Sequence, residues 1–295
     1  MGKRNEIDFI GIGSAKSGSS WVAKMLEKHP DILFSAQKSK KELRFFNTAG
    51  DHDYIKDNFN NFNKGINWYL NQFPDPAPSK IRGEFSISYL TDKEAPKNIK
   101  KYFSDIKIIA VLRNPTDMIY SLYWFSRATI ETKVPDSFEE LVDKHIFLDR
   151  GKYYKHLKRY FKLFPKENIH IILHDDLKKS PEKVLKKLYK FLNINSNYLP
   201  PDYSKRINTA KFTRFPIIQS VLSNLMNLLK KTKLIDNVQK YNFFEKIYVA
   251  YAKFNLKKAD YPKMKIKTRK KLNCYYKKDI KKLEKLINVN LSDWR

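Results

Sequence analysis

Residues 7–21 run Ile-Asp-Phe-Ile-Gly-Ile-Gly-Ser-Ala-Lys-Ser-Gly-Ser-Ser-Trp, and this stretch decides the fold. The apolar run Phe9 to Ile12 predicts a buried strand, and apolar residues from Trp21 to about His29 recur at helical spacing. A turn of small residues joins the two elements, so backbone N–H groups and the positive end of a helix would face the same point. The stretch therefore predicts an anion-binding strand, turn and helix.

The turn also carries donors and a positive charge of its own. Lys16 supplies the charge, and hydroxyl groups come from Ser17, Ser19 and Ser20. The glycines that we expect to let the backbone approach a phosphate closely are Gly11, Gly13 and Gly18. Gly and Ser also mark ordinary turns, so a purely structural turn stays open as an alternative at this point.

The obvious first hypothesis, a nucleotide-triphosphate P-loop, does not fit these residues. That motif needs Lys directly after its last glycine, whereas Ser19 follows Gly18 and the lysine lies earlier, at Lys16. A P-loop enzyme also needs an aspartate near the end of a second apolar strand to help hold Mg²⁺. The best such strand, Ile108 to Leu112, ends in Arg113 instead. The pattern disfavours a P-loop kinase and favours a phosphate-like ligand held by fixed cations without a metal.

With both segments in view, the chain resembles the sulfotransferases that use 3′-phosphoadenosine 5′-phosphosulfate. The first family motif, Lys-x-Gly-[Ser/Thr]-[Ser/Thr]-Trp/Leu after a strand, matches Lys16-Ser17-Gly18-Ser19-Ser20-Trp21. The second motif is an apolar strand, then Arg-x-Pro, then a serine eight residues after the arginine. It matches Ile108 to Leu112, Arg113-Asn114-Pro115 and Ser121. The order and spacing of the two motifs together predict the family.

Further segments resemble the glycan-modifying, heparan-sulfate-type branch of that family. They are Glu42-Leu43-Arg44-Phe45-Phe46, Gly65-Ile66-Asn67-Trp68-Tyr69, Gly83-Glu84 and the ending Asn290-Leu291-Ser292-Asp293-Trp294. The resemblance implies a hydroxyl or amine acceptor on a carbohydrate, while a lipid-linked sugar or another small-molecule acceptor stays open. The chain departs from the eukaryotic glycan enzymes at Phe85, where they carry Lys after the glutamate. This departure weakens any transfer of their acceptor specificity.

The resemblance also implies a role for each motif residue. Lys16 would contact the phosphosulfate bridge and stabilise the leaving phosphate, while the backbone of Ser17 to Ser20 would hold the 5′-phosphate. Trp21 belongs with these donor-binding residues, and Arg113 and Ser121 would hold the 3′-phosphate. The product would be adenosine 3′,5′-bisphosphate, and no metal would be required.

Glu42 matches the position at which the glycan-modifying branch places its catalytic carboxylate. A carboxylate beside the acceptor oxygen or nitrogen can take its proton. The alternative is that Glu42 forms a loop ion pair with Lys38 or Lys41, in which case Glu84 or a histidine would be the base. The motif match favours Glu42.

The alternation of apolar strands and helical segments predicts one α/β domain over residues 1–295. Its central parallel sheet would carry helices on both faces and a P-loop-like strand, turn and helix. Residues 216–256 are apolar and Lys-rich at helical spacing, which predicts a helical insertion that acts as an acceptor lid, a membrane-surface helix or a packing element. His170 and His174 flank a predicted strand, and we expect both to be structural.

Composition narrows the class of protein. A net charge of +28 suits anionic partners, so a non-catalytic polyanion-binding protein with a relic nucleotide pocket is the alternative to an enzyme. Zinc-finger spacing and RNP-type aromatic motifs are missing, so a specific nucleic-acid partner is not expected. The single cysteine, Cys274, excludes an intrachain disulfide, and no run of apolar residues is long enough to predict a membrane span. We expect a cytoplasmic enzyme; peripheral membrane contact and the oligomeric state stay open.

Overall fold

The computed structural model describes residues 7–35, 42–48, 61–128, 134–205, 211–213, 256–258 and 261–295, together with isolated residues between 218 and 254. Its centre is a five-stranded sheet in the order β2-β3-β1-β4-β5, in which every neighbouring pair is parallel. The strands of this sheet are β1 Phe9–Gly13, β2 Ile32–Phe34, β3 Ile81–Phe85, β4 Lys107–Leu112 and β5 Ile169–Leu173. The predicted central parallel sheet is confirmed.

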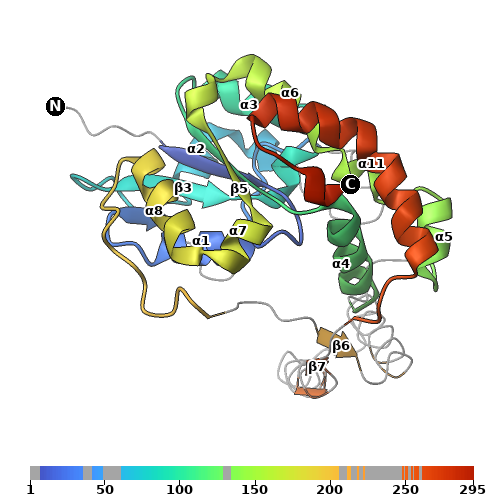
Figure 1. Cartoon of the computed structure of the whole chain (residues 1–295). Helices are drawn as coiled ribbons and strands as arrows, with labels where there is room; N and C mark the ends of the chain where they lie inside the picture. The colour runs from blue at the N-terminus through green and yellow to red at the C-terminus, as the bar shows by residue number, and fades with distance from the viewer. Residues whose placement is uncertain are drawn as a thin grey trace.

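Helices cover both faces of the sheet, as predicted (Figure 1). The α-helices are α1 Ser19–Glu27, α2 Gly65–Leu70, α3 Ala95–Tyr102, α4 Pro115–Ala128, α5 Phe138–Asp143, α6 Tyr153–Leu163, α7 His174–Lys179, α8 Pro181–Leu192 and α11 Ile266–Ile287. Short 3₁₀-helices are η1 Asn61–Lys64, η2 Ile87–Leu90, η3 Leu148–Gly151, η4 Lys166–Asn168 and η5 Ser292–Trp294.

The alternation of side chains along each strand divides the core into two layers. From β4, Ile108 and Ala110 point to the face covered by α3 and α6, whereas Ile109 and Val111 point to the face covered by α1 and α8. All four side chains are fully buried. A strand that is buried on both faces needs apolar residues at every position. This explains why the sequence of β4 is a continuous apolar run.

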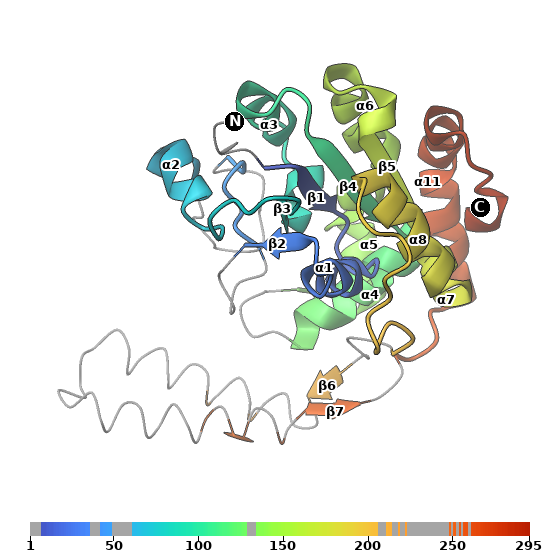
Figure 2. The same ribbon diagram turned by 90° about the vertical axis from the view of Figure 1, so that its left-hand side faces the viewer.

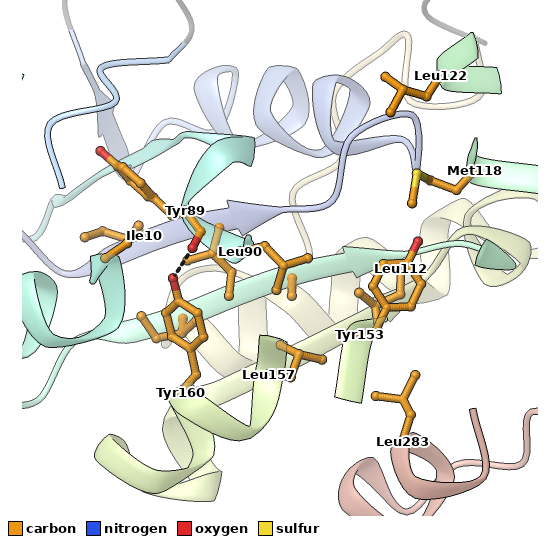
Figure 3. Close-up of a cluster of buried hydrophobic side chains, with 14 of the residues drawn as sticks. Ile10, Tyr89, Leu90, Leu112, Met118, Leu122, Tyr153, Leu157, Tyr160 and Leu283 are labelled. Atoms are coloured by element: carbon orange, nitrogen blue, oxygen red, sulfur yellow. Dashed lines mark hydrogen bonds between the residues drawn. The ribbon is translucent and has the colours of Figure 1, made fainter. Parts of the chain in front are cut away.

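A hydrogen bond between two tyrosines links α6 to η2 inside the larger core layer. The hydroxyl of Tyr160 donates to the backbone carbonyl of Tyr89 at 2.7 Å (Figure 3). Both rings are fully buried, and Ile10, Leu90 and Leu157 belong to the same cluster. A buried hydroxyl without a partner would be costly, so this bond lets a large polar aromatic residue fill the core. The contact fixes α6 against the segment that follows β3.

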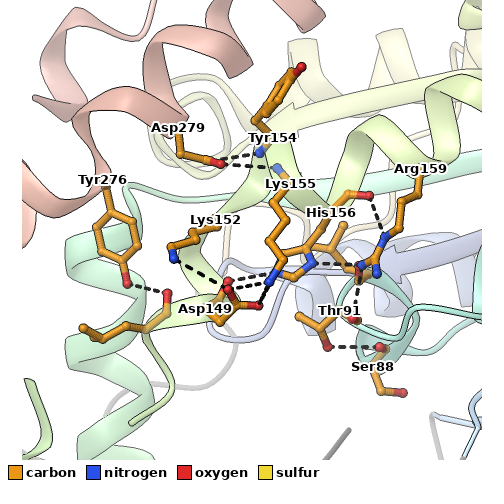
Figure 4. A network of polar contacts seen from close by, with 12 residues as sticks. Ser88, Thr91, Asp149, Lys152, Tyr154, Lys155, His156, Arg159, Tyr276 and Asp279 are labelled. Carbon is orange, nitrogen blue, oxygen red and sulfur yellow. Dashed lines mark hydrogen bonds and ion pairs between the residues drawn. The ribbon is translucent and has the colours of Figure 1, made fainter. Parts of the chain in front are cut away.

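A polar network fixes the start of α6 (Figure 4). The carboxylate of Asp149 accepts from Lys155 at 2.7 and 2.8 Å, and the carbonyl of Asp149 accepts from Nε2 of His156 at 2.8 Å. Arg159 donates to Nδ1 of His156 at 2.9 Å and to the carbonyl of Thr91 at 3.1 Å. Burial lowers the pKa of His156 to about 4, so the ring is neutral and can accept from Arg159. The network therefore ties α6 to both η3 and the end of η2.

A second sheet consists of two short strands. β6 Lys211–Thr213 and β7 Leu256–Lys258 pair antiparallel, with Lys211 opposite Lys258 and Thr213 opposite Leu256. β6 contacts α4, and Figure 2 shows the two strands below that helix. The predicted insertion or lid at 216–256 lies mostly outside the described residues. Its role and the single-domain boundary 1–295 therefore stay predictions.

Two glycines of the sheet lie under phenyl rings. A Cβ at Gly11 would lie 2.1 Å from the ring of Phe85, and a Cβ at Gly83 would lie 2.5 Å from the ring of Phe9. Both rings are fully buried. The prediction that Gly11 lets a phosphate approach is therefore wrong, because its missing side chain makes room for Phe85 in the core.

We expect Gly83→Ala to lower the free energy of unfolding by roughly 1–3 kcal/mol, the usual cost of overpacking a core. The added methyl group would meet the buried ring of Phe9. Urea unfolding followed by tryptophan fluorescence measures the loss. Adding Phe9→Leu should recover part of it, since residues in contact show non-additive effects. Strict additivity of the two substitutions would contradict the contact.

Candidate active site

The turn between β1 and α1 takes a backbone form that few residues adopt. Gly18 is the N-cap of α1 with a φ of 95°, in the left-handed region that favours glycine. A Cβ there would also lie 2.9 Å from Leu177. Lys16 has a positive φ of 55°, which costs energy in a residue with a side chain. The surroundings must therefore hold this turn in place.

Buried hydroxyl groups support the turn from the side of the core. The Oγ atoms of Ser14 and Ser17 lie 2.6 Å apart in a hydrogen bond, and Ser14 Oγ also donates to the carbonyl of Val111 at 3.1 Å. The hydroxyl of Tyr153, at the start of α6, lies 3.4 Å from Ser14 Oγ. Burial raises the pKa of Tyr153 to about 12, so its hydroxyl stays protonated. Ser17 is fully buried, and its hydroxyl is thus engaged within the core.

Two side chains from neighbouring strands bind carbonyl groups of the turn. Arg113, after β4, donates to the carbonyl of Lys16 at 3.1 Å, and Nδ1 of His174, after β5, donates to the carbonyl of Ser17 at 3.0 Å. Burial and the charge of Arg113 lower the pKa of His174 to about 4, so the ring is neutral. In a trans peptide the following N–H points opposite to the carbonyl. The N–H groups of Ser17 and Gly18 therefore point away from these two side chains.

The first turn of α1 suits a negative ligand. The helix begins at Ser19, and within the described residues no side chain caps it and no acidic residue lies in its first turn. A helix start carries a partial positive charge, which favours an anion. Trp21 is the third residue of the helix and packs, half-buried, against the core between α1 and α8. Ser19, Ser20 and Trp21 thus lie together at the end of the turn.

Lys16 lies over an aromatic ring. Its Nζ atom is 4.0 Å from the centroid of Phe125, a residue of α4. The face of an aromatic ring attracts a cation, so the contact orients the ammonium group. Burial first, and the charge of Arg113 second, lower the pKa of Lys16 to about 8. Lys16 is therefore charged at neutral pH, but it loses its proton more readily than an ordinary lysine.

Ser121 lies on the side of α4 that faces the turn. Ser121 and Phe125 are four residues apart on one helix, so they share a face, and Phe125 is the residue beneath Lys16. Ser121 is buried. The helix is held at its start by Asn114, whose Oδ1 accepts from the N–H of Thr116 at 3.0 Å. Arg113 and Ser121 thus flank the first turns of α4.

Glu42 begins a segment that packs on the end of β3. Arg44 Nε donates to Glu42 Oε2 at 3.2 Å, and the side chain of Glu42 is 15% exposed. The N–H of Arg44 donates to Ser86 Oγ at 3.0 Å. The alternative pairing of Glu42 with Lys38 or Lys41 lies outside the described residues. Glu42 is thus an ion-paired carboxylate at the carboxyl end of β3, the neighbour of β1.

Glu84, the alternative base, is fully buried. Tyr89 and Tyr69 donate to its Oε1 at 2.7 and 3.2 Å, and Ser86 donates to its Oε2 at 2.6 Å. A carboxylate without exposed surface does not reach an acceptor in this arrangement. Phe85, where the chain departs from the glycan-type motif, packs on the opposite face of the sheet. The base assignment to Glu84 is therefore not supported.

All of these groups lie at one edge of the sheet. β1 pairs with β3 on one side and with β4 on the other, so the turn, the Glu42 segment and Arg113 adjoin the carboxyl ends of neighbouring parallel strands. Ligands of open parallel sheets bind at this edge. The arrangement can hold phosphate groups by N–H dipoles and fixed cations, with a carboxylate beside them.

Comparison with known proteins places this geometry in a family. Residues 6–284 match the sequence profile described as the sulfotransferase domain. This chain belongs to the sulfotransferase family. The resemblance predicted from the two motifs is confirmed, and the P-loop kinase alternative is not supported.

Curated relatives of this sulfotransferase modify heparan sulfate. The human heparan sulfate glucosamine 3-O-sulfotransferase 5 is 32% identical over 207 residues, which cover 66% of this chain and 54% of that protein. The mouse bifunctional heparan sulfate N-deacetylase/N-sulfotransferase 3 is 29% identical over 209 residues, which cover 64% of this chain and 22% of that protein. The match thus spans about half the length of the first relative and less than a quarter of the second.

A solved structure has the same fold. The crystal structure of a sulfotransferase from Alicyclobacillus acidocaldarius superposes with a TM-score of 0.67 and covers 98% of this chain and 99% of its own. The two sequences are 22% identical, so the likeness concerns the fold alone.

Two features are absent from the residues that the structure describes: a membrane-spanning helix and a cluster of metal-ligating side chains. No helix among the described residues is both long enough and apolar enough to cross a bilayer. The same residues contain no group of three or more His, Cys, Asp or Glu side chains that could hold a metal ion. The absence of a metal requirement in the reaction stays a prediction.

Three residues of the site were not predicted from the sequence: Tyr153 and His174, which support the turn, and Phe125, which lies under Lys16. His174, which we expect from the sequence to be structural, is half-buried and binds the turn directly. Its one local signal is its position directly after β5, the same position that Arg113 has after β4. The structural interpretation of His170 agrees with its stacking on Phe191, at 4.9 Å between ring centroids.

We expect adenosine 3′,5′-bisphosphate to bind less tightly as the pH rises through about 8, because the pKa of Lys16 lies there. Below that pH the ammonium is charged; above it, affinity should fall by up to roughly tenfold per pH unit if binding requires the charged form. A bound phosphate raises this pKa and leaves the sign unchanged. Isothermal titration calorimetry at a series of pH values measures the effect.

The matched control is Lys16→Arg, since a guanidinium stays charged throughout this range. This variant should bind the bisphosphate near pH 7 and lose the decline at higher pH. The same decline in Lys16→Arg would assign the titration to another group.

Proposed function

We propose that this chain transfers a sulfuryl group from 3′-phosphoadenosine 5′-phosphosulfate to a hydroxyl or amine of a carbohydrate acceptor. The observation that carries the proposal is the meeting of the two motifs: Arg113 donates to the carbonyl of Lys16 at 3.1 Å. The charges of Lys16 and Arg113 therefore lie near each other beside this turn, at the carboxyl edge of a parallel sheet. Membership of the sulfotransferase family supports the same reaction class.

The residues present fit a donor with two phosphate-bearing ends. Lys16 and the backbone of Ser17 to Ser20 would hold the 5′ end, because the N–H groups of Ser17 and Gly18 point away from Arg113 and His174. Arg113 and Ser121 would hold the 3′-phosphate, since a guanidinium fork suits phosphate oxygens. Trp21, in the first turn of α1, would lie beside the same donor. The product of the donor would be adenosine 3′,5′-bisphosphate.

The donor supplies the sulfuryl group and a phosphate leaving group. Lys16, charged at neutral pH, stabilises the negative charge that develops on the leaving phosphate. Glu42 takes the proton of the acceptor hydroxyl or amine, whose oxygen or nitrogen forms the new bond to sulfur as the sulfur–oxygen bond to the phosphate breaks. Oriented cations and N–H groups perform this stabilisation, so we propose that no metal takes part.

A carbohydrate acceptor is supported by the two relatives named for heparan sulfate. The net charge of +28 also suits an anionic glycan. A lipid-linked sugar or another small-molecule acceptor gives the same chemistry at the site. Cytoplasmic location stays a prediction.

The test is transfer of labelled sulfate from the donor to a panel of acceptors: desulfated heparan-type polysaccharide, its N-deacetylated form, a lipid-linked sugar and simple alcohols. We expect transfer to a carbohydrate at a rate unchanged by a chelator. Binding of the bisphosphate with no transfer to any acceptor would favour the non-catalytic polyanion-binding alternative. Tight binding of ATP–Mg²⁺ and none of the bisphosphate would overturn the proposal.

We expect Glu42→Gln to slow transfer by roughly 10²–10⁴-fold, the usual contribution of a general base. The amide can still accept from Arg44 but cannot take a proton, so affinity for the bisphosphate should stay near normal. Single-turnover transfer and calorimetry measure the two effects. Glu94→Gln is the matched control, because Glu94 is a surface carboxylate paired with Lys97 at 3.2 Å. A Glu42→Gln rate above about a tenth of wild type, with chemistry rate-limiting, would move the base elsewhere.

A further inference from the structure

Glu84 is a fully buried carboxylate that the reaction does not use as a base. Its oxygens accept from Tyr69 of α2 at 3.2 Å, from Tyr89 of η2 at 2.7 Å and from Ser86 at 2.6 Å. The backbone N–H of Leu43 also favours the ionised form and lowers the pKa of this carboxyl group. An ionised carboxylate only accepts hydrogen bonds, so its environment of donors matches the ionised form. A buried group so fully engaged holds together the elements that donate to it.

Hydrogen bonds link the buried carboxylate to the segment that carries Glu42. The N–H of Arg44 donates to Ser86 Oγ at 3.0 Å, while the same hydroxyl donates to Glu84. Arg44 Nε in turn donates to Glu42 Oε2 at 3.2 Å. A continuous chain of hydrogen bonds therefore runs from the buried carboxylate to the one at the site.

The backbone of this segment needs such an anchor. Arg44 has a φ of 50°, a left-handed conformation that costs energy in a residue with a side chain. The N–H group of Arg44 itself leads to Glu84 through Ser86. Loss of the carboxylate would weaken this support for the conformation of Arg44, and with it for the direction of Glu42.

We propose that Glu84 is a positioning residue that holds the Glu42–Arg44 ion pair at the carboxyl end of β3 through Ser86. The part of this proposal that concerns the transfer rate rests on the proposed function. The part that concerns the conformation of residues 42–48 does not, and it can be measured without any substrate.

Protonation of Glu84 would weaken the anchor. Burial raises the pKa of Glu84 to about 7, against the opposing effect of its hydrogen bonds. The groups that face it are Tyr69 and Tyr89. Burial raises the pKa of both hydroxyls, so both stay neutral donors. The charge of Arg82, which lies on the same strand as Glu84, acts in the opposite direction and lowers the pKa of Tyr69. Below pH 7 the new O–H needs an acceptor, so one of the surrounding hydroxyl groups must turn and give up the hydrogen bond that it donates to Glu84. Transfer should therefore fall as the pH falls through about 7.

The experiment compares wild type with Glu84→Gln and Ser86→Ala by hydrogen exchange and by transfer assay. Glutamine keeps the size of the side chain but turns an NH₂ group toward donors. We expect faster amide exchange in a peptide covering residues 42–48, with exchange in β1 and β4 unchanged. Affinity for adenosine 3′,5′-bisphosphate should stay within about twofold, and transfer should fall about 10–100-fold, as for the loss of outer partners of functional groups.

The pH profile separates positioning from general loss of structure. The step near pH 7 should disappear in Glu84→Gln, and in Tyr69→Phe it should move to higher pH, because one hydrogen bond to the ionised form is lost. Glu284→Gln is the matched control, since Glu284 accepts from the backbone N–H of Leu291 at 2.8 Å and, within the described part of the chain, makes no hydrogen bond to residues 42–48. It should change neither the exchange of 42–48 nor the pH step.

Exchange of residues 42–48 at the wild-type rate in both Glu84→Gln and Ser86→Ala would overturn the proposal, whatever the activity. If Glu84→Gln does not fold, Ser86→Ala alone decides, because it cuts the link to Arg44 and leaves Glu84 in place. If wild type transfers no sulfate to any acceptor, the proposed function fails, and the exchange result still decides whether Glu84 holds the segment.

Discussion

The pairing of β1 with a neighbour on each side is the constraint on which the site depends. Gly11 lies opposite Phe85 of β3 and opposite Ile109 of β4. Because these strands are parallel, the turn after β1, Arg113 after β4 and the segment fastened to the end of β3 meet at one edge. The contact between Arg113 and Lys16 joins residues that are 97 positions apart. Only the sheet brings them together.

The same edge concentrates positive charge. Lys16 and Arg113 are close enough for the charge of one to lower the pKa of the other, and both are partly removed from water. An anion bound between them would relieve that repulsion. The carbonyl groups of the turn are already bound by Arg113 and His174. Donors that are oriented beforehand need little reorganisation during a reaction, so these supporting contacts contribute as much as the groups that face the ligand.

Buried polar groups beneath the edge make the arrangement specific. Tyr153 lies under the turn and Glu84 under the Glu42 segment, and both are fully buried with hydrogen-bond partners. A buried polar group that loses its partner is costly. Each such group therefore favours one position of the loop above it. The sulfotransferase edge is held by the core as well as by the strands that end there.

The sequence by itself determined the parts of this protein that are contiguous in the chain. Phe9 to Trp21 showed the strand, turn and helix, and the apolar run before Arg113 showed a central strand that ends in a cation, because periodicity and turn chemistry are local properties. Tertiary structure decided which polar groups face the site. Glu84 and the Ser17 hydroxyl point into the core, whereas Glu42 is paired at the edge and His174 binds the turn. Those outcomes depend on burial and hydrogen-bond partners supplied by distant segments, which no local pattern contains.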